Sequence, residues 1–423
     1  MKNSLGFLFA LLFSFNALTI YAQEKWTCYS DDDTLLTDDH HGILGAFEYK
    51  DGTFWIVTTR GINVFDGEKW KRIDQKTGLM KKAVASYLLD SKNNIWVGSG
   101  SPEFGYGPAD IYHGGVALFD GKDWKLMLTK EMGLKAAIVS RIFESSTGDI
   151  WIQISNLPPG AEETSMFVKG GLLHYTNNEF KIYRAKDVPC LNCNYARGFY
   201  EDDTGRIWMW TGKGSIMYYE DGKFTRVTKE NGYPILGRRV MATFVDSKKN
   251  FWLAGLGRVV KYDGNSWTRF NRKNGLPSSS FFPQGFAENS DGKIFLGINN
   301  GVYEFDGKEE WTRDKKQFIS SSIFIDKDDR IWVPAVKGLE VRDGSEVSKD
   351  KDLQGVWGIL EDNNGGTWAF TRNNGAKRLK DGNWTYYTDK NQLPSNKLTM
   401  AHVTNDGTLW VGTKKGICKC EYD

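Results

Sequence analysis

Short apolar strands separated by polar turns repeat along this chain about every forty residues. Variants of the pattern D-x-x-G-x-(I/L/F)-W, followed by a glycine, a further strand and a turn such as D-G-x-x-W, recur in these repeats, starting with Asp51-Gly52-Thr53-Phe54-Trp55. The aromatic residue of the second strand recurs nine times, at Trp55, Trp96, Trp151, Trp208, Trp252, Phe295, Trp332, Trp368 and Trp410. A helical period is absent. Four strand-sized runs in each repeat predict an all-β protein, a β-propeller of nine four-stranded antiparallel blades in one ring.

The ninth repeat stops after its third strand, and the piece that it lacks is present at the other end of the chain. Residues 24–29 read Glu-Lys-Trp-Thr-Cys-Tyr and match a fourth strand, with Trp26 in the position that Trp70 has in the first repeat. We expect a strand of about residues 24–30 to complete the last blade, because this covers an open sheet edge and closes the ring.

The five cysteines of the chain fall at positions that suggest pairs. If the last blade pairs its strands as the first repeat does, Cys418 lies opposite Cys28, and opposed residues of antiparallel strands are about 4.5–5.5 Å apart, within disulfide range. Cys420, two residues along the same face, is the alternative partner and otherwise the unpaired thiol. Cys190 and Cys193 form a C-x-x-C pair, for which we expect a local disulfide, with free thiols as the alternative.

Residues 1–22 have the charged, apolar and small-residue zones of a secretory signal peptide, which leaves 23–423 as the propeller. The apolar run is shorter than the roughly 20 residues that a membrane span needs, which favours a cleaved signal peptide. A retained membrane anchor is the alternative. We expect an exported protein, periplasmic or extracellular, without stable membrane insertion. The net charge of +2 and the lack of a long basic block argue against nucleic acid as a partner.

Small residues occupy the first strand of each repeat, where we expect the strands to crowd around the axis. They are Gly45, Ser86, Ser140, Gly198, Ala242, Gly285, Ser322, Gly358 and Ala401. We expect the second-strand aromatics to pack one blade against the next rather than to stack on carbohydrate. The Asp-x-x-Gly sequences predict hairpin turns, because they lack the alternating carboxylates of calcium loops. No metal site and no cofactor are expected.

Two neighbouring repeats carry long insertions between their second and third strands. These are residues 99–114, with Phe104, Tyr106, Tyr112 and His113, and residues 155–170, with Phe167. In an up-and-down blade, these turns emerge on the same face of the ring as the links between blades. Long loops on a rigid scaffold are preferred sites of recognition, so this face is the candidate binding surface.

Cationic and polar residues lie in the links that lead into the first strands on that face. The cations of three consecutive repeats are Arg141, Arg197, Arg238 and Arg239, and other repeats place Gln284, Asn396 and Lys397 there. A cationic sector beside aromatic loops suits an acidic sugar, a carboxylate or a sulfated glycan. The alternative is an ordinary solvated surface with no ligand.

The signs of catalysis are few. The chain has five histidines and no nucleophile elbow, zincin motif or P-loop. Tyr112 with His113 or His402 is the first candidate for acid–base chemistry, against a surface role for His113 and a packing role for His402. We therefore assign no catalytic residue, and whether the protein is an enzyme stays uncertain, with non-enzyme favoured.

Repeats such as Ile-Trp-Val-Gly-Ser-Gly at 95–100, with Leu-Pro-Ser links at 276–278 and 393–395, resemble the two-component regulator propeller repeat. That repeat forms the periplasmic sensor region of hybrid histidine kinases in Bacteroidetes-type bacteria. The resemblance covers nearly all of residues 23–423 and implies a ligand-sensing or carbohydrate-responsive propeller outside the cytoplasm. The sequence departs from the full pattern, because we find no kinase, receiver or helix-turn-helix region in it.

These observations favour an exported, non-catalytic propeller that binds a glycan or an envelope protein through the face with the two insertions. One alternative is a propeller lyase or hydrolase acting on a polysaccharide or small molecule, since streptogramin-lyase-like propellers have a similar repeat. The other alternative is a structural interaction platform in the cell envelope. The sequence does not specify the oligomeric state.

Overall fold

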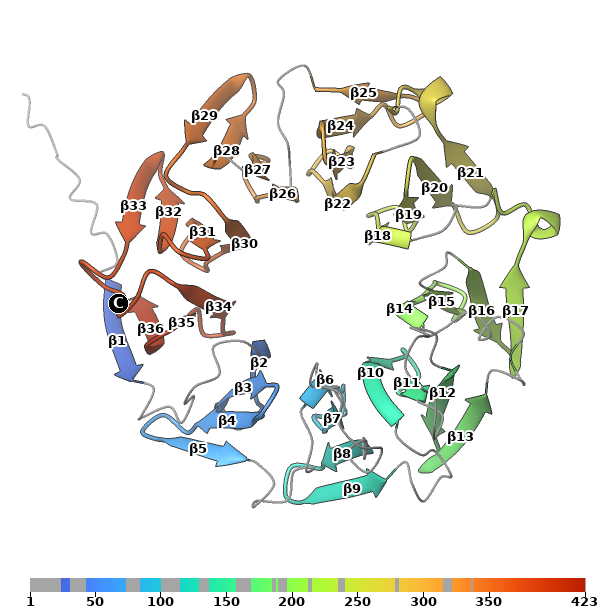
Figure 1. Ribbon diagram of the computed structural model, residues 1–423, viewed down its shortest axis with the longest axis horizontal. Coiled ribbons are helices and arrows are strands. Elements are labelled where there is room, and N and C mark those ends of the chain that lie inside the picture. Colours follow the sequence, from blue (N-terminus) through green and yellow to red (C-terminus); the bar gives the residue numbers. More distant parts are fainter. Residues whose placement is uncertain are drawn as a thin grey trace, which may run out of the picture.

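The computed structural model describes residues 24–30, 43–73, 84–99, 115–128, 137–156, 169–184, 188, 196–211, 215–234, 240–277, 281–314, 322–335 and 338–422. Over these ranges, the strands form nine four-stranded antiparallel sheets that stand around a ring (Figure 1). The predicted nine-bladed β-propeller is confirmed. Within the same ranges, no helix is long and apolar enough to cross a membrane.

Blades are numbered here in chain order, and the first three follow one another from the start of the ring. Blade 1 is β2 (Ile43–Glu48), β3 (Phe54–Thr58), β4 (Gly61–Phe65) and β5 (Trp70–Ile73). Blade 2 is β6 (Val84–Leu89), β7 (Ile95–Ser99), β8 (Gly115–Phe119) and β9 (Trp124–Leu128). Blade 3 is β10 (Ala137–Glu144), β11 (Ile150–Asn156), β12 (Lys169–Thr176) and β13 (Glu179–Arg184).

Two short 3₁₀ helices occur in the described chain, in the links that follow the next two blades. They are η4 (Lys229–Asn231) after blade 4 and η5 (Arg272–Asn274) after blade 5. Blade 4 is β14 (Ala196–Glu201), β15 (Ile207–Thr211), β16 (Ile216–Glu220) and β17 (Lys223–Val227). Blade 5 is β18 (Val240–Val245), β19 (Phe251–Gly255), β20 (Arg258–Tyr262) and β21 (Trp267–Phe270). Blade 6 is β22 (Pro283–Glu288), β23 (Ile294–Ile298), β24 (Gly301–Phe305) and β25 (Trp311–Arg313).

The last three blades bring the chain back to its start. Blade 7 is β26 (Phe324–Ile325), β27 (Ile331–Ala335), β28 (Gly338–Asp343) and β29 (Glu346–Asp350). Blade 8 is β30 (Val356–Glu361), β31 (Thr367–Thr371), β32 (Ala376–Lys380) and β33 (Asn383–Tyr387). Blade 9 is β34 (Leu398–Val403), β35 (Leu409–Thr413) and β36 (Gly416–Tyr422), with β1 (Glu24–Ser30) as its fourth strand. The first strand of each blade lies innermost in the ring (Figure 1).

The recurring Asp and Trp of the repeat are hydrogen-bonded to each other. In blade 5, Asp246 Oδ1 accepts the backbone N–H of Asn250 at 2.8 Å, and its Oδ2 accepts the indole N–H of Trp252 at 2.8 Å. The same Asp–Trp bond occurs in blades 2, 4, 7 and 8. One carboxylate therefore closes the hairpin turn and satisfies a buried donor. Blade 6 has Asn289 and Phe295 at these positions, and a phenyl ring needs no acceptor.

A second recurring contact joins neighbouring blades. Ser91 in the first turn of blade 2 donates its backbone N–H and its hydroxyl to the carboxylate of Glu144 in blade 3, at 2.8 and 2.6 Å. Such charge-assisted bonds hold the first turn of a blade against the next blade. Equivalent pairs are Ser146 with Glu201, Ser247 with Glu288 and Ser290 with Asp329, while Lys327 and Asn405 donate a backbone N–H to Glu361 and Glu48.

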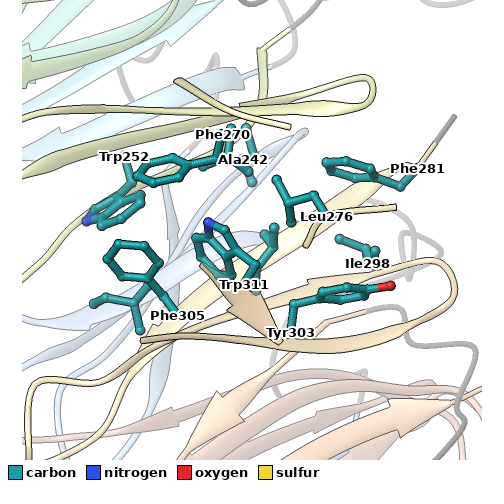
Figure 2. Packing of buried hydrophobic residues seen from close by; sticks show 13 residues of the cluster. Ala242, Trp252, Phe270, Leu276, Phe281, Ile298, Tyr303, Phe305 and Trp311 are labelled. Atoms are coloured by element: carbon teal, nitrogen blue, oxygen red, sulfur yellow. The ribbon is translucent and has the colours of Figure 1, made fainter. Parts of the chain in front are cut away.

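Apolar side chains fill the space between adjacent blades, as the interface of blades 5 and 6 illustrates. Figure 2 shows Trp252 of blade 5 facing Trp311 and Phe305 of blade 6, with indole centroids 5.9 Å apart and nearly perpendicular. Phe281, from the link between these blades, is buried in the same cluster. The second-strand aromatic is a packing residue here, as its recurrence predicts.

The N-terminal strand closes the ring at blade 9. β1 pairs antiparallel with β36, and this register places Cys28 opposite Cys418. The predicted disulfide between these two residues is present, and Cys420 is a buried free thiol. Trp26 on β1 packs against Trp368 and Tyr387 of blade 8, with centroids 6.2 and 5.4 Å away.

An ion pair reinforces this closure. The Glu24 carboxylate on β1 accepts hydrogen bonds from Arg378 Nη1 at 2.7 Å and from the hydroxyl of Tyr387. Arg378 is buried, and its Nη2 also pairs with Asp362 Oδ2 at 2.7 Å. The same Asp362 oxygen accepts the indole N–H of Trp368. Because a buried guanidinium without its carboxylate is costly, Glu24 anchors β1 to blade 8 as well as to blade 9.

The structure corrects the expectation about small residues in the first strands. The position of Gly45, which pairs with Val57, is occupied in blades 3 and 9 by Arg141 and Met400 rather than by Ser140 and Ala401. Crowding at the axis is not the general cause. A Cβ added to Gly45 would collide with the Tyr87 hydroxyl of the next blade, whereas one added to Gly285 or Gly358 would meet no described atom within 4 Å.

The Asp–Trp bond leads to a stability prediction. Replacing Asp246 by Ala leaves the Trp252 indole and the turn amides without their acceptor, so we expect a loss of about 2–4 kcal/mol in unfolding free energy. The control is Asp51→Ala, because Trp55 in blade 1 donates to Thr53 Oγ1 instead, and Asp51 is exposed. It should cost less than about 1 kcal/mol. Equal costs for the two variants in chemical denaturation would contradict this assignment.

The closure leads to a second prediction. Cys28→Ser removes a cross-link between residues 390 positions apart and should lower the unfolding free energy by about 2–5 kcal/mol. Burial raises the pKa of the Cys420 thiol to about 12, so its reactive thiolate is scarce at neutral pH. Peptide mapping after alkylation of the native protein should find Cys420 unmodified, and labelling that appears only on unfolding. Alkylation of Cys28 without a reductant would show that the bond is not formed.

Candidate functional site

Links between blades and the turns between second and third strands come together on one face of the ring, called here the link face. Backbone hydrogen bonds join a link to a turn in several blades: Val84 N–H to Thr59 O at 2.8 Å, Gly257 N–H to Phe281 O at 3.2 Å, and Lys414 N–H to Lys397 O at 2.9 Å. These bonds fix the turns against the starts of the first strands. The link face is therefore a rigid surface around the inner rim of the ring.

A β-bulge interrupts the first strand of eight blades close to the link face, among the residues that the structure describes. In β2, for example, Ile43 pairs with Thr58 and Gly45 with Val57, which leaves Leu44 without a partner in the register. Bulges redirect side chains and are common beside binding sites. The bulged residues are Leu44, Ala85, Ser140, Arg197, Met241, Gln284, Trp357 and Thr399.

Several bulged residues expose large apolar side chains at the inner edge of the ring. Leu44, Met241 and Trp357 are 37–38% exposed. Leu256, in the second turn of blade 5, and Phe282, in the link to blade 6, are 37% and 47% exposed. Thus five of the seven exposed large hydrophobic residues in the described ranges lie on the link face. Met241, Leu256 and Phe282 belong to neighbouring blades 5 and 6, and exposed apolar residues that are grouped in this way make a surface a candidate interaction site.

Three of these residues form an apolar patch on blades 5 and 6. Met241 follows Val240, whose strand partner Gly255 precedes Leu256. The next residue, Gly257, is hydrogen-bonded to the link at Phe281, which places Phe282 beside Leu256. Asn299 binds both backbone groups of Phe282. Its side-chain Oδ1 accepts the Phe282 N–H at 2.9 Å, and its backbone N–H donates to Phe282 O at 3.1 Å. The exposed phenyl ring thus stands on a fixed backbone.

An aromatic and basic sector occupies the link face of blades 8 and 9. Trp357 lies against Phe370, with ring centroids 6.1 Å apart. Its neighbour Val356 pairs with Thr371, which precedes the exposed Arg372. Arg372 N–H donates to Gly355 O at 3.1 Å, so the arginine projects from a turn that is tied to the strand of Trp357.

The structure describes two of the predicted cationic positions. Arg141 is exposed, one residue after the bulge of β10, and Arg197 is the bulged residue of β14. The two strands are neighbours, because Phe143 and Phe199 stack across them at 5.6 Å. The two positions therefore lie on adjacent first strands, within β10 and β14 rather than in the links that lead into them, and their role in binding stays a prediction.

Several predicted site residues lie outside the described residues. They are Phe104, Tyr106, Tyr112, His113, Phe167, Arg238 and Arg239, together with Cys190 and Cys193. Most of the two insertions, 99–114 and 155–170, also lies outside them. Those assignments stay predictions.

His402 lies in the interior of the ring, away from the link face. It sits near the far end of β34, opposite Trp410 in the register, and its ring is 5.8 Å from Phe54 of blade 1. Burial lowers the pKa of His402, against a smaller opposing effect of Glu48, so the imidazole is neutral at pH 7. These contacts are those of a residue that packs blade 9 against blade 1.

The arrangement on the link face is suited to binding. It combines rigid exposed apolar side chains with exposed cations, and no cluster of three or more potential metal ligands occurs in the described parts of the chain. Trp357, Met241, Leu256, Phe282 and Arg372 were not singled out from the sequence. Aligning the nine repeats at their second-strand aromatics would place the bulged residues in one column and show the large apolar residues there.

Comparison with known proteins identifies no family. No family profile and no curated protein matches the sequence. Solved structures with low similarity include the extracellular domain of a putative hybrid two component system of B. thetaiotaomicron, BT3049, at 18% identity and TM-score 0.37. That match covers 89% of this chain and 56% of the other, so the chain spans little more than half of that domain. Sensor domains of the kind that the repeat resembles are thus among its structural neighbours.

Two other neighbours have different roles. Virginiamycin B lyase from Staphylococcus aureus matches at 13% identity and TM-score 0.44, over 94% of this chain and 99% of the lyase. PorZ, a surface component of the type-IX secretion system of Porphyromonas gingivalis, matches at 13% identity and TM-score 0.41, over 89% of this chain and 62% of PorZ. Similarities this low do not transfer a ligand or an activity.

Proposed function

We propose that this chain is an exported, non-catalytic binding propeller that recognises a glycan or an envelope protein through its link face. The observation that carries the proposal is the gathering of five exposed large hydrophobic residues on that face. Three of them are bulged residues of first strands, so a recurring feature of the backbone presents them. The chain would act as a sensor if ligand binding changes its contact with a partner protein.

The predicted cationic residues and insertions extend the same surface. Arg141 and Arg197 belong to the first strands of blades 3 and 4, and the sequence inserts residues 99–114 and 155–170 in blades 2 and 3. We assign Phe104, Tyr106, Tyr112, His113 and Phe167 of these insertions to ligand contact. Arg238 and Arg239 precede β18 and would continue the cationic sector to blade 5.

Export is supported by two independent features. Residues 1–22 have the zones of a signal peptide, and the ring is closed by a disulfide, a bond that persists in oxidising compartments. We place the protein in the periplasm or at the cell surface.

The proposal is tested with a variant of the apolar patch. Met241→Ser, Leu256→Ser and Phe282→Ser together remove exposed apolar area without touching the core, so the melting temperature should stay close to that of the wild type. Binding on a glycan array and to purified envelope proteins should fall by about tenfold or more. The matched control is Leu126→Ser, which is 48% exposed and lies on the outermost strand of blade 2, β9, rather than at the inner rim of the ring.

A second variant tests the insertions separately. Replacing residues 99–114 and 155–170 by short turns should reduce the same binding. Undiminished binding by both the triple variant and the insertion variant would show that the link face is not the binding surface. Product analysis on each ligand that binds should find it unchanged, and turnover of any of them would exclude a non-catalytic role.

A further inference from the structure

The bulge of β30 gives Trp357 a position unlike that of the other tryptophans in the blades. The second-strand tryptophans are buried between blades, whereas Trp357 is 37% exposed at the inner edge of the ring. Phe370 supports its ring at 6.1 Å, and Phe370 in turn stacks on Trp368 at 5.9 Å. A large aromatic surface that is rigidly backed yet open to solvent can accept a flat apolar ligand face.

The turn beside Trp357 is rigid and carries polar side chains. Thr371 Oγ donates to Gly375 O at 2.7 Å and accepts the N–H of Asn374 at 2.8 Å, while Asn374 Nδ2 donates to Asp352 O at 2.8 Å. These bonds fix the turn that presents Arg372. Its guanidinium offers donors in a planar array that matches carboxylate or sulfate groups.

Positive charge continues from this turn into blade 9. Gly375 N–H donates to Asn396 O at 2.9 Å, and the next residue, Lys397, accepts the N–H of Lys414 at its carbonyl, also at 2.9 Å. Links and turns in this sector, 351–355, 372–374, 388–397 and 414–415, hold six Lys and Arg against two Asp. One of the two, Asp389, accepts a hydrogen bond from Asn396 Nδ2 at 2.8 Å. This excess favours an anionic ligand.

We propose that the sector formed by Trp357, Arg372, Lys397 and Lys414 binds an anionic oligosaccharide. One pyranose ring stacks its C–H face on Trp357, and carboxylate or sulfate groups of the same or adjacent sugars pair with Arg372 and the lysines. A chain of several sugars suits the site better than a single sugar, because the cations are spread over two blades. The inference rests on the proposed function and specifies a ligand class and a subsite for it.

Isothermal titration calorimetry with the whole protein tests this assignment. The probes are tetragalacturonate for carboxylates, a chondroitin sulfate hexasaccharide for sulfates, cellotetraose as a neutral saccharide and tetraglutamate as an acidic peptide. We expect at least one anionic saccharide to bind, more weakly at about 0.5 M NaCl than at low salt. Cellotetraose and tetraglutamate should bind at least about tenfold more weakly.

Variants locate the subsite. Trp357→Ala and Arg372→Ala should each weaken binding of the anionic saccharide by about tenfold or more, and Trp357→Phe should retain most of it. Leu126→Ala and Arg226→Ala are the controls, since both residues are exposed on outer strands, and they should leave binding unchanged. Circular dichroism melting of every variant shows whether a loss reflects unfolding.

The inference is overturned if neither anionic saccharide binds at about 1 mM, if the neutral or peptide probe binds as well, or if folded Trp357→Ala binds normally. These outcomes leave the proposed function standing as long as the apolar-patch variant still loses its ligand. The proposed function is contradicted by a different result, namely that the apolar-patch and insertion variants both bind every ligand as the wild type does.

Discussion

Each blade of this ring buries both faces of its sheet against neighbours, and that is possible for all nine only because the ends of the chain are joined. The joint consists of β1 on β36, the disulfide between Cys28 and Cys418, and the pairing of Glu24 with Arg378. Without β1, the outer edge of blade 9 would be open and Trp26 would leave its place between blades 8 and 9. The packing of blade 9 against blades 8 and 1, and with it the continuity of the ring, depends on this closure.

The repeat itself is scaffold, and the features that bear on function are departures from it. The recurring Asp, Trp, Ser and Glu residues bond to one another within the blades and between them, which leaves them no free groups for a ligand. What varies from blade to blade is the bulged residue of the first strand. Leu44, Met241 and Trp357 are large and exposed there, while Ala85 is small. The same backbone bulge therefore presents different side chains in different blades.

The sequence predicted the number of blades, their strand order and the partner of Cys28, because these follow from a regular repeat and a simple hairpin register. It did not predict the bulges, since one extra residue shifts the register without changing the apolar pattern. Ser140 and Ala401 were misplaced by one position because blades 3 and 9 have large residues, Arg141 and Met400, at the position of Gly45. The Ser91–Glu144 contact was also missed, because its partners lie in different repeats. The exposure of Trp357 depends on a bulge, so the aligned repeats could show a large apolar residue at this position but not that its side chain is exposed.

The role of closure is measured most directly by hydrogen exchange of the native protein before and after reduction of the disulfide. If the account is right, reduction speeds the exchange of amides in β1 and β36 first, then elsewhere in blade 9, while blades 4 and 5 on the far side of the ring stay protected. Exchange in β1 and β36 that does not change on reduction, or a first opening at another pair of blades, would contradict it.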